Sequence, residues 1–321
     1  MKLSLKKISE FEDIAEFFEF FQTEQDCVDY LEKIIWKGKM PTSPFDITSQ
    51  VYECDDQETK GKNSVKYKRY RCRNTGKYFN VKNVTIFKNS KLPLLKWFLA
   101  LFYLSIGRIS SYQLIEHIKM TQKTSWFVIQ RLRIAFEIPD FETMLKNVVE
   151  IDEAFFGGKN KNRHKDKKAP KCQGRNWKDK IPMFGMLERG GNLIIWVVPN
   201  TRWKTLEPII RANIKESSTV NTDEWYRKSN LSRWYNHQMV NHRIKQYANG
   251  KVSVNGVENV WSNFKRDVYG TYRYISRKHA QKYANEFAFR FNTRKYSTKD
   301  RFDLVLSSSV GKNITYRELI A

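Results

Sequence analysis

In Val148-Val-Glu-Ile-Asp152, apolar and acidic side chains alternate along the chain. A period of two places Val149 and Ile151 on one face of a β-strand. Glu150 and Asp152 then lie on the opposite face, with Asp152 at the carboxyl end of the strand. Upstream of this segment the apolar residues follow a helical period instead, so residue 148 marks the beginning of a region with a different fold.

The residues that follow predict a mixed sheet with flanking helices. Two apolar runs, at 181–187 and 193–199, are joined by Glu188-Arg-Gly-Gly-Asn192, which is typical of a hairpin because glycine and asparagine tolerate positive φ. The later elements are a helix at 205–214, strands at 217–223 and 237–242, and a helix at 257–264. In this order of elements, the first and fourth strands are expected to be neighbours in the middle of the sheet. Residues 147–295 are therefore predicted to form an α/β domain.

The N-terminal part of the chain is predicted to be mostly helical. We expect helices in residues 1–37, a small β module in 38–90, a second helical region in 91–140, and a C-terminal tail in 296–321. Within 91–140, a long helix precedes two short helices that are separated by a tight turn, which is the outline of a helix-turn-helix. The second short helix carries the candidate DNA contacts Gln122, Lys123, Thr124, Gln130, Arg131 and Arg133. An ordinary three-helix bundle with a basic surface fits the same pattern.

The charge of the chain indicates a polyanionic partner. Among 321 residues, 58 are Lys or Arg and 34 are Asp or Glu, which gives a formal net charge of +24. Hydrophobic residues make up 40%, enough for a folded core, so a wholly disordered chain is excluded. Because a charge of this size opposes compaction until a polyanion neutralises it, double-stranded DNA is the expected partner.

The basic tract at 159–171 is a second candidate DNA contact. It includes Lys159, Lys161 and Arg163, and it directly follows the first predicted strand of the α/β domain. A solvated loop is the alternative interpretation.

The cysteines and apolar segments bear on the location of the protein. The four scattered cysteines do not form a secreted disulfide framework. The longest apolar segment is far too short to cross a membrane, and the N-terminal residues lack the apolar stretch of a signal peptide. We expect no membrane association and, in a bacterium, a cytoplasmic location at the nucleoid.

Three carboxylates are placed where they could carry chemistry. Asp152 and Asp223 end the first and fourth predicted strands, and Glu258 lies near the start of the late helix. Like charges that close repel one another unless a cation neutralises them, and hard oxygen ligands suit Mg²⁺ or Mn²⁺. Two such ions would support hydrolysis and strand transfer at a DNA phosphodiester. A chain with 34 acidic residues also contains many such triples by chance.

Several stretches resemble one family in collinear order over about residues 20–295. They are 91–100, Gln122-Lys-Thr-Ser-Trp126, 150–159, Thr222-Asp-Glu-Trp225, Val240-Asn-His242, Asn255-Gly-Val-Glu-Asn-Val-Trp261 with Lys265, and 286–294. The chain resembles the bacterial insertion-sequence transposases related to the eukaryotic Merlin elements, a branch of the DDE superfamily.

The resemblance implies an RNase H-like core and assigns roles to individual residues. The family's two aspartates fall on Asp152 and Asp223, and its third acidic residue falls on Glu258. In some members an asparagine takes the third role, and Asn255 stands at that position. The lysine that follows in the family's helix falls on Lys265, where it would contact a DNA phosphate.

The chain departs from this family at the expected zinc ribbon. Many relatives carry two Cys-x-x-Cys knuckles, whereas here the corresponding stretches are Cys54-Asp-Asp-Gln57 and Cys72-Arg-Asn-Thr75. Two thiols cannot close a tetrahedral structural site, so we expect no structural zinc and a degenerate ribbon-like module.

Other side chains have both functional and structural interpretations. His242 is a candidate proton relay or phosphate contact, and a hydrogen-bonded strand histidine is the alternative. Trp225 and Trp261 are predicted to be core residues rather than stacking platforms for bases. Arg290 and Arg294 are predicted to form either a phosphate clamp or a solvated helix flank.

Together these features predict a transposase that binds the terminal inverted repeats of its own element through residues 40–136. Residues 147–295 would cut the DNA and join it to a target. Because two element ends must be held at once, a homodimer or larger assembly is expected. The alternatives are a catalytically inactive or domesticated transposase-derived DNA-binding regulator, and a general RNase H-like nuclease.

Overall fold

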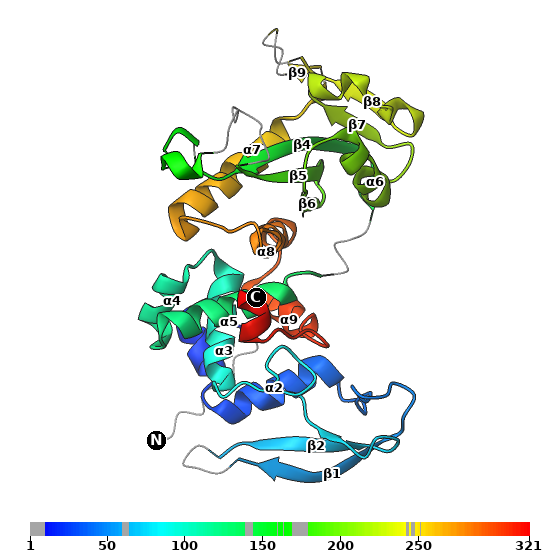
Figure 1. Cartoon of the computed structure of the whole chain (residues 1–321). Coiled ribbons are helices and arrows are strands. Elements are labelled where there is room, and N and C mark those ends of the chain that lie inside the picture. The colour runs from blue at the N-terminus through cyan, green and yellow to red at the C-terminus, as the bar shows by residue number, and fades with distance from the viewer. Residues whose placement is uncertain are drawn as a thin grey trace. The chain divides into compact units, whose positions relative to one another are not determined.

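The computed structural model divides the chain into two compact units. The first contains Met1–Glu137 and Lys295–Ala321, and the second contains Ile138–Arg294. The structure describes residues 10–59, 64–138, 144–158, 160–162, 164–168, 179–241, 244, 248–250 and 252–321 (Figure 1). Within these residues, no helix is both long and apolar enough to cross a membrane.

The second unit is built on a five-stranded mixed sheet in the order β6-β5-β4-β7-β8. Its strands are β4 (Val148–Phe156), β5 (Ile181–Glu188), β6 (Leu193–Val197), β7 (Thr219–Thr222) and β8 (Asn236–Met239). β4, β5 and β6 form an antiparallel meander, whereas β7 runs parallel to β4 and β8 runs parallel to β7. The prediction that the first and fourth strands are central neighbours is confirmed.

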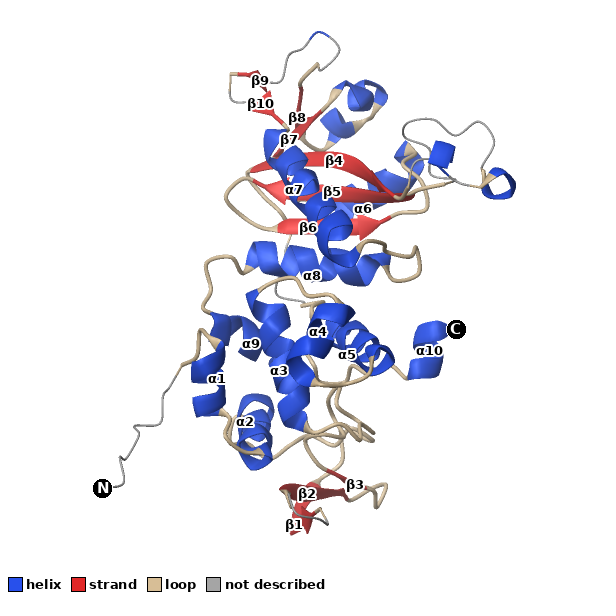
Figure 2. Cartoon of the chain, turned by 90° about the vertical axis from the view of Figure 1, so that its left-hand side faces the viewer, coloured by secondary structure: helices blue, strands red, loops and turns tan. Residues whose placement is uncertain are grey.

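Helices cover both faces of this sheet. They are α6 (Trp203–Asn213), α7 (Asn255–Arg266) and α8 (Ala280–Asn292), and Figure 2 shows α7 lying across the sheet. Val149 and Ile151 share one apolar core with α6. Phe156 belongs to a second core on the other face, which includes Trp261 and Phe264 of α7. The alternation in the sequence therefore assigns the two faces of β4 correctly, and the apolar residues Val257, Val260, Trp261 and Phe264 of α7 are buried.

Short elements connect the sheet and the helices. They are the 3₁₀ helices η2 (Asn160–Asn162), η3 (Lys165–Lys167), η4 (Glu224–Lys228) and η5 (Leu231–Arg233), the hairpin strands β9 (Ala248–Asn249) and β10 (Val252–Ser253), and the π-helical segment η7 (Asp267–Tyr272). β4 extends four residues beyond the predicted end at Asp152, and in this extension the buried apolar residues Ala154 and Phe156 lie on the α7 face, which Glu150 and Asp152 share.

The first unit is a helical assembly with a small sheet. Its helices are α1 (Ile14–Phe20), α2 (Glu24–Trp36), α3 (Leu94–Ile106), α4 (Ser111–Ile118), α5 (Gln122–Ala135), α9 (Thr298–Ser307) and α10 (Tyr316–Ile320), and its strands are β1 (Val51–Glu58), β2 (Lys66–Cys72) and β3 (Tyr78–Phe79). Phe302 of α9 packs edge-on against Phe11 and Phe98 inside this unit. Residues 296–321, which the sequence pattern assigns to a tail, therefore complete the N-terminal core.

The three helices expected in residues 91–140 are present as α3, α4 and α5. Lys119 ends α4 in the left-handed region at φ 48°, and Thr121 caps α5 through the backbone N–H of Thr124. The Ser125 hydroxyl donates to the Ser111 carbonyl at 2.8 Å, which ties the two short helices together. This geometry fits both a helix-turn-helix and a plain bundle.

The module at 38–90 contains the antiparallel sheet β1-β2-β3. Cys54 lies half-buried in β1, and Cys72 is buried at the end of β2. The Cys72 thiol lies 3.2 Å from the Ser49 hydroxyl. The expectation of no structural zinc stays a prediction.

Candidate active site

The register of the two central strands places the first two predicted carboxylates side by side. Val148 pairs with Thr219 and Glu150 pairs with Asn221, in a parallel ladder with a constant offset of 71 positions. If this register is extended, the position opposite Asp152 is Asp223, which directly follows β7. Since parallel strands end at the same edge and paired positions face the same way, both aspartates belong to the α7 face of the sheet.

Asp223 is held at the start of a short helix. Its side chain is only 9% exposed, and its Oδ1 accepts the backbone N–H of Trp225 at 3.0 Å, which caps η4. Asp152 is half-buried. A capped and largely buried aspartate has a restricted orientation, as expected of a group that holds a ligand.

The pKa of a buried tyrosine is affected by the carboxylates at the carboxyl ends of β4 and β7. The Tyr226 hydroxyl donates a hydrogen bond to Glu153, which lies between two residues of the α7 face and points to the other side of the sheet. Burial raises the pKa of Tyr226 well above its ordinary value, and the Glu153 carboxylate raises it further. Asp152 and Asp223 act in the same direction, so both lie close enough to affect this hydroxyl. Tyr226 is therefore a neutral donor beside a concentration of carboxylates.

A buried carboxylate, paired with a partly exposed arginine, attaches the start of α7 to the central strand. Glu150 is 2% exposed, and its Oε2 accepts the backbone N–H of Val257 at 3.0 Å. Its Oε1 accepts from the Arg189 Nε at 2.7 Å, and the same guanidinium donates to the Ser253 hydroxyl at 2.7 Å. The Glu150 carboxylate thus links β4 to α7 directly, and it links β4 to the β5–β6 hairpin and β10 through Arg189. It thereby fixes the start of α7, the helix that carries Glu258.

Two glycines permit the close approach of α7 to the sheet. A Cβ on Gly256 would lie 2.7 Å from Glu150 Oε2, and a Cβ on Gly185 would lie 2.6 Å from the Trp261 ring. Gly185 pairs with Asp152 across β4 and β5, so Trp261 packs over the row that carries this aspartate. A side chain at position 256 would overlap the Glu150 carboxylate, which is why a glycine fits between Asn255 and Val257.

The remaining predicted residues of the site lie on the outer surface of α7. Asn255, Glu258 and Lys265 are all exposed. Among the residues that the structure describes, no three Asp, Glu, His or Cys side chains gather closely enough to hold a metal ion. Asp152 and Asp223 are therefore neighbours by register, and the joining of Glu258 to them stays a prediction.

Several predicted DNA contacts are corrected by their burial. Gln130 is 0% exposed, Arg131 4% and Arg133 2%, so these side chains do not lie on the surface of the first unit, where the sequence predicts contacts to duplex DNA. Gln122 and Lys123 are exposed and Thr124 is half-buried, so this part of the predicted set remains accessible.

The other predicted contacts cannot be placed. Lys159, Arg163 and His242, together with the side chain of Lys161, lie outside the described residues.

Two further interpretations change. Trp225, expected in the core, is 59% exposed directly beside Asp223, whereas Trp261 is buried as expected. Arg290 is neither a phosphate clamp nor a solvated flank, because it is half-buried and forms ion pairs with Asp267 at 2.9 Å and with Glu286.

Sequence reasoning missed Glu150 and Arg189 as positioning residues. Their pairing joins segments 39 residues apart, and the only local signal was an acidic residue on the polar side of the first strand.

Comparison with known proteins shows which family this architecture is similar to. The ISXO2-like transposase domain matches residues 144–292. A transposase-like protein of Haemophilus influenzae is 35% identical over 98 residues, which cover 30% of this chain and 77% of that protein. The chain belongs to the insertion-sequence transposases. A protein in the transposable element ISH50 of Halobacterium salinarum is 26% identical over 253 residues, or 76% of this chain and 85% of that protein. No solved structure matches the chain significantly.

The region matched to the transposase domain coincides with the second unit. It begins four residues before β4 and ends with the last residue of α8. All three predicted carboxylates, together with Glu150, Arg189 and Gly256, fall inside it. The family assignment therefore rests on the part of the chain that contains the candidate site.

Proposed function

We propose that the protein binds the terminal inverted repeats of its own element, cuts their 3′ ends and joins them to target DNA. The observation that carries this proposal is the β4–β7 register, which makes Asp152 and Asp223 neighbours at the carboxyl ends of two parallel strands. The transposase family supports DNA as the substrate. The motif resemblance supports the Merlin-related group and an RNase H-like core.

Asp152, Asp223 and Glu258 would hold two divalent cations. Their carboxylates are the hard oxygen donors that Mg²⁺ and Mn²⁺ prefer. On the same face, Asn221 has a buried Oδ1 without a hydrogen-bond partner in the described structure, so this face of the sheet also offers an uncommitted oxygen. When bound, two such ions supply an activated attacking oxygen and stabilise the departing one.

The chain's own residues would position the DNA. Asp223 is oriented by its cap on η4, and Glu258 is carried by a helix that Glu150 fixes to β4. The exposed Lys265 lies two turns after Glu258 and would contact a phosphate as a mobile point charge. Gln122 and Lys123, exposed at the start of α5, are the retained candidates for reading the terminal repeat through a helix-turn-helix.

Holding two element ends requires at least two copies of the DNA-binding unit. We therefore expect a homodimer or a larger assembly on DNA.

One alternative is a catalytically inactive DNA-binding relative, because no three acidic side chains among the described residues gather closely enough to hold a metal ion. Such a protein would bind the repeat through the first unit and cut nothing.

The proposal is tested with a duplex that carries the inverted repeat flanking the gene. The Asp152→Asn variant should bind this duplex as the wild type does and lose Mg²⁺-dependent cleavage of the 3′ end by more than about 100-fold. Glu216→Gln, which removes an exposed carboxylate from the same unit, should cleave normally. Unchanged cleavage by Asp152→Asn would remove the assignment, and cleavage that ignores the repeat would indicate a general nuclease.

A further inference from the structure

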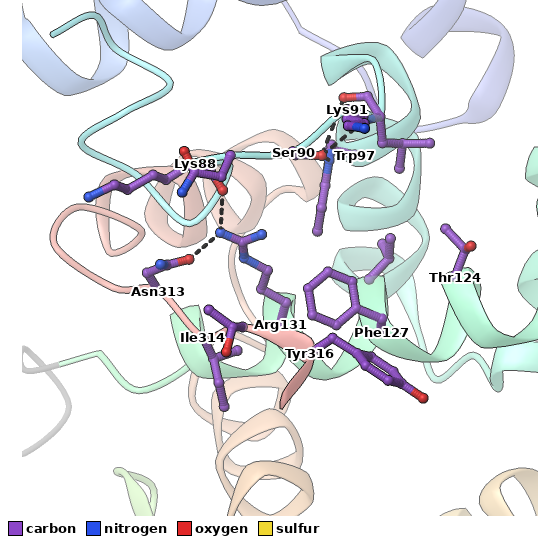
Figure 3. A pocket seen from close by; sticks show the side chains of 14 residues that line it. Lys88, Ser90, Lys91, Trp97, Thr124, Phe127, Arg131, Asn313, Ile314 and Tyr316 are labelled. Atoms are coloured by element: carbon purple, nitrogen blue, oxygen red, sulfur yellow. Dashed lines mark hydrogen bonds between the residues drawn. The ribbon is translucent and has the colours of Figure 1, made fainter. Parts of the chain in front are cut away.

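A cavity lies within the first unit, beside the start of α5. It has a volume of about 500 Å³ and is lined by loop residues 88–92, by α3, by α5 and by residues 313–316 (Figure 3). This volume lies within the usual range for small-molecule sites. The described lining residues include Lys88, Lys91 and Arg131 but no Asp or Glu. A cavity with cationic and no acidic lining residues favours an anionic ligand.

Arg131 is the buried cation of this cavity. Its guanidinium donates to the Lys88 carbonyl at 2.7 Å and to Asn313 Oδ1, both of which are neutral acceptors. Its Nε–H is buried with no acceptor in the described structure, and burial lowers its pKa to about 10. A buried guanidinium that lacks a carboxylate partner is costly, so the site can gain free energy from an anion.

Aromatic rings form the wall beside this cation. The Arg131 guanidinium carbon lies 5.6 Å from the centre of the Phe127 ring and 5.8 Å from that of Trp97. Phe127 meets Tyr316 edge-on at 5.9 Å, and Figure 3 shows these two rings side by side next to Arg131. The Trp97 Nε1–H already donates to Ser90 at 2.9 Å, so its ring is fixed in place. Rigid aromatic faces of this kind stack on nucleobases.

We propose that this cavity binds one nucleotide unit, with its phosphate against Arg131 and Lys91 and its base against Phe127 and Tyr316. A phosphate alone would place no ligand group against the rings of Phe127 and Tyr316, which form cation–π contacts with Arg131 and Lys123. A neutral base alone would leave Arg131 with neutral acceptors in the described structure. A nucleotide satisfies both. Arg131 thereby acquires a role in place of the surface DNA contact that its burial excludes.

The nucleotide can come from two sources. One is an unpaired nucleotide of a DNA end, and this source rests on the proposed function; Thr124, a candidate DNA contact, is among the residues that line the cavity. The other is a free mononucleotide, which would bind whether or not the protein cuts DNA. The phosphate and base contacts are the same for both.

The test uses calorimetric titration of the full chain with dAMP at low salt. The wild type should bind with a dissociation constant below about 1 mM, and deoxyadenosine and inorganic phosphate should each bind at least about tenfold more weakly. Tyr316→Ala should weaken dAMP binding by about fivefold to 150-fold through loss of stacking. Lys91→Gln, at an exposed position, should weaken dAMP binding by about threefold.

The matched control is Arg317→Gln, which removes an exposed cation one residue after Tyr316 and outside the cavity lining; it should bind dAMP normally. A duplex with a short single-stranded overhang then separates the sources. Displacement of dAMP by the overhang, and not by a blunt duplex, identifies a DNA end, whereas displacement by mononucleotides alone identifies a free nucleotide. Absence of saturable dAMP binding, or equal binding by the Tyr316→Ala, Lys91→Gln and Arg317→Gln variants, overturns the inference.

Discussion

Replacing Gly256 with alanine should loosen the attachment of α7 to the central strand. The new Cβ would lie 2.7 Å from Glu150 Oε2 and 3.0 Å from Leu187 Cδ2. A carboxylate at the end of a free side chain could move away, but Glu150 is buried and its oxygens accept from Val257 and Arg189. Relief of the overlap therefore breaks at least the hydrogen bond to the start of α7.

The size of the effect follows from these contacts. A hydrogen bond to a charged group contributes about 1.5–3 kcal/mol, and the greater helix propensity of alanine returns at most about 1 kcal/mol. The Arg189 ion pair is partly exposed and is not counted. Gly256→Ala should thus destabilise the second unit by about 1–2 kcal/mol.

The assay is urea denaturation combined with hydrogen exchange of the α7 amides, in which protection of the Val257 N–H should fall. Gly270→Ala is the matched control, because its Cβ meets nothing within 4 Å, and it should leave stability unchanged or slightly raised. In a Glu150→Ala background, Gly256→Ala should cost much less, since the overlap with the carboxylate is gone. A Gly256→Ala protein as stable as the wild type, or an equal loss in both backgrounds, would refute the reasoning.

Three more predictions follow from the same structure. Gly185→Ala should destabilise the second unit more than Gly256→Ala does, because its Cβ would lie 2.6 Å from the rigid Trp261 ring, and denaturant midpoints would measure this. Burial raises the pKa of Glu32 to about 7, so the folded state loses stability as pH rises from about 4.5 to 7; Glu32→Gln should raise the melting temperature at pH 8 and leave it nearly unchanged at pH 4. Lys123→Ala should weaken binding to the terminal repeat and reduce the dependence of the affinity on salt concentration, which titrations at two salt concentrations would measure. An unchanged salt dependence in the variant would contradict a contact between Lys123 and a DNA phosphate.

The sequence predicts the sheet well because its signals are local. The alternation through Asp152, the hairpin residues 188–192 and the apolar stripe of α7 each lie within a dozen residues, and all are observed. The neighbouring positions of Asp152 and Asp223 follow from the order of the elements, since a helical connection returns β7 parallel to the first strand.

What the sequence could not predict depends on contacts between distant segments. Arg131 is buried by Asn313, 182 positions away, in a segment with the pattern of a tail. The polar side chains of Gln130 and Arg133 predict surface positions on α5, because polar residues usually lie there, but both are buried. Trp225 is predicted to be a core residue, but it lies two positions after the cap residue Asp223 in a short helix and is exposed.

The central claim is that Asp152 and Asp223 together form a divalent-cation site on the α7 face of the sheet. The most direct test is a titration of the full chain with Mn²⁺ in the absence of DNA, in which electron paramagnetic resonance measures the bound Mn²⁺. The wild type should bind Mn²⁺, Asp152→Asn and Asp223→Asn should each lose at least about tenfold in affinity, and Glu216→Gln should bind as the wild type does. Equal Mn²⁺ affinity in all four proteins would contradict the account.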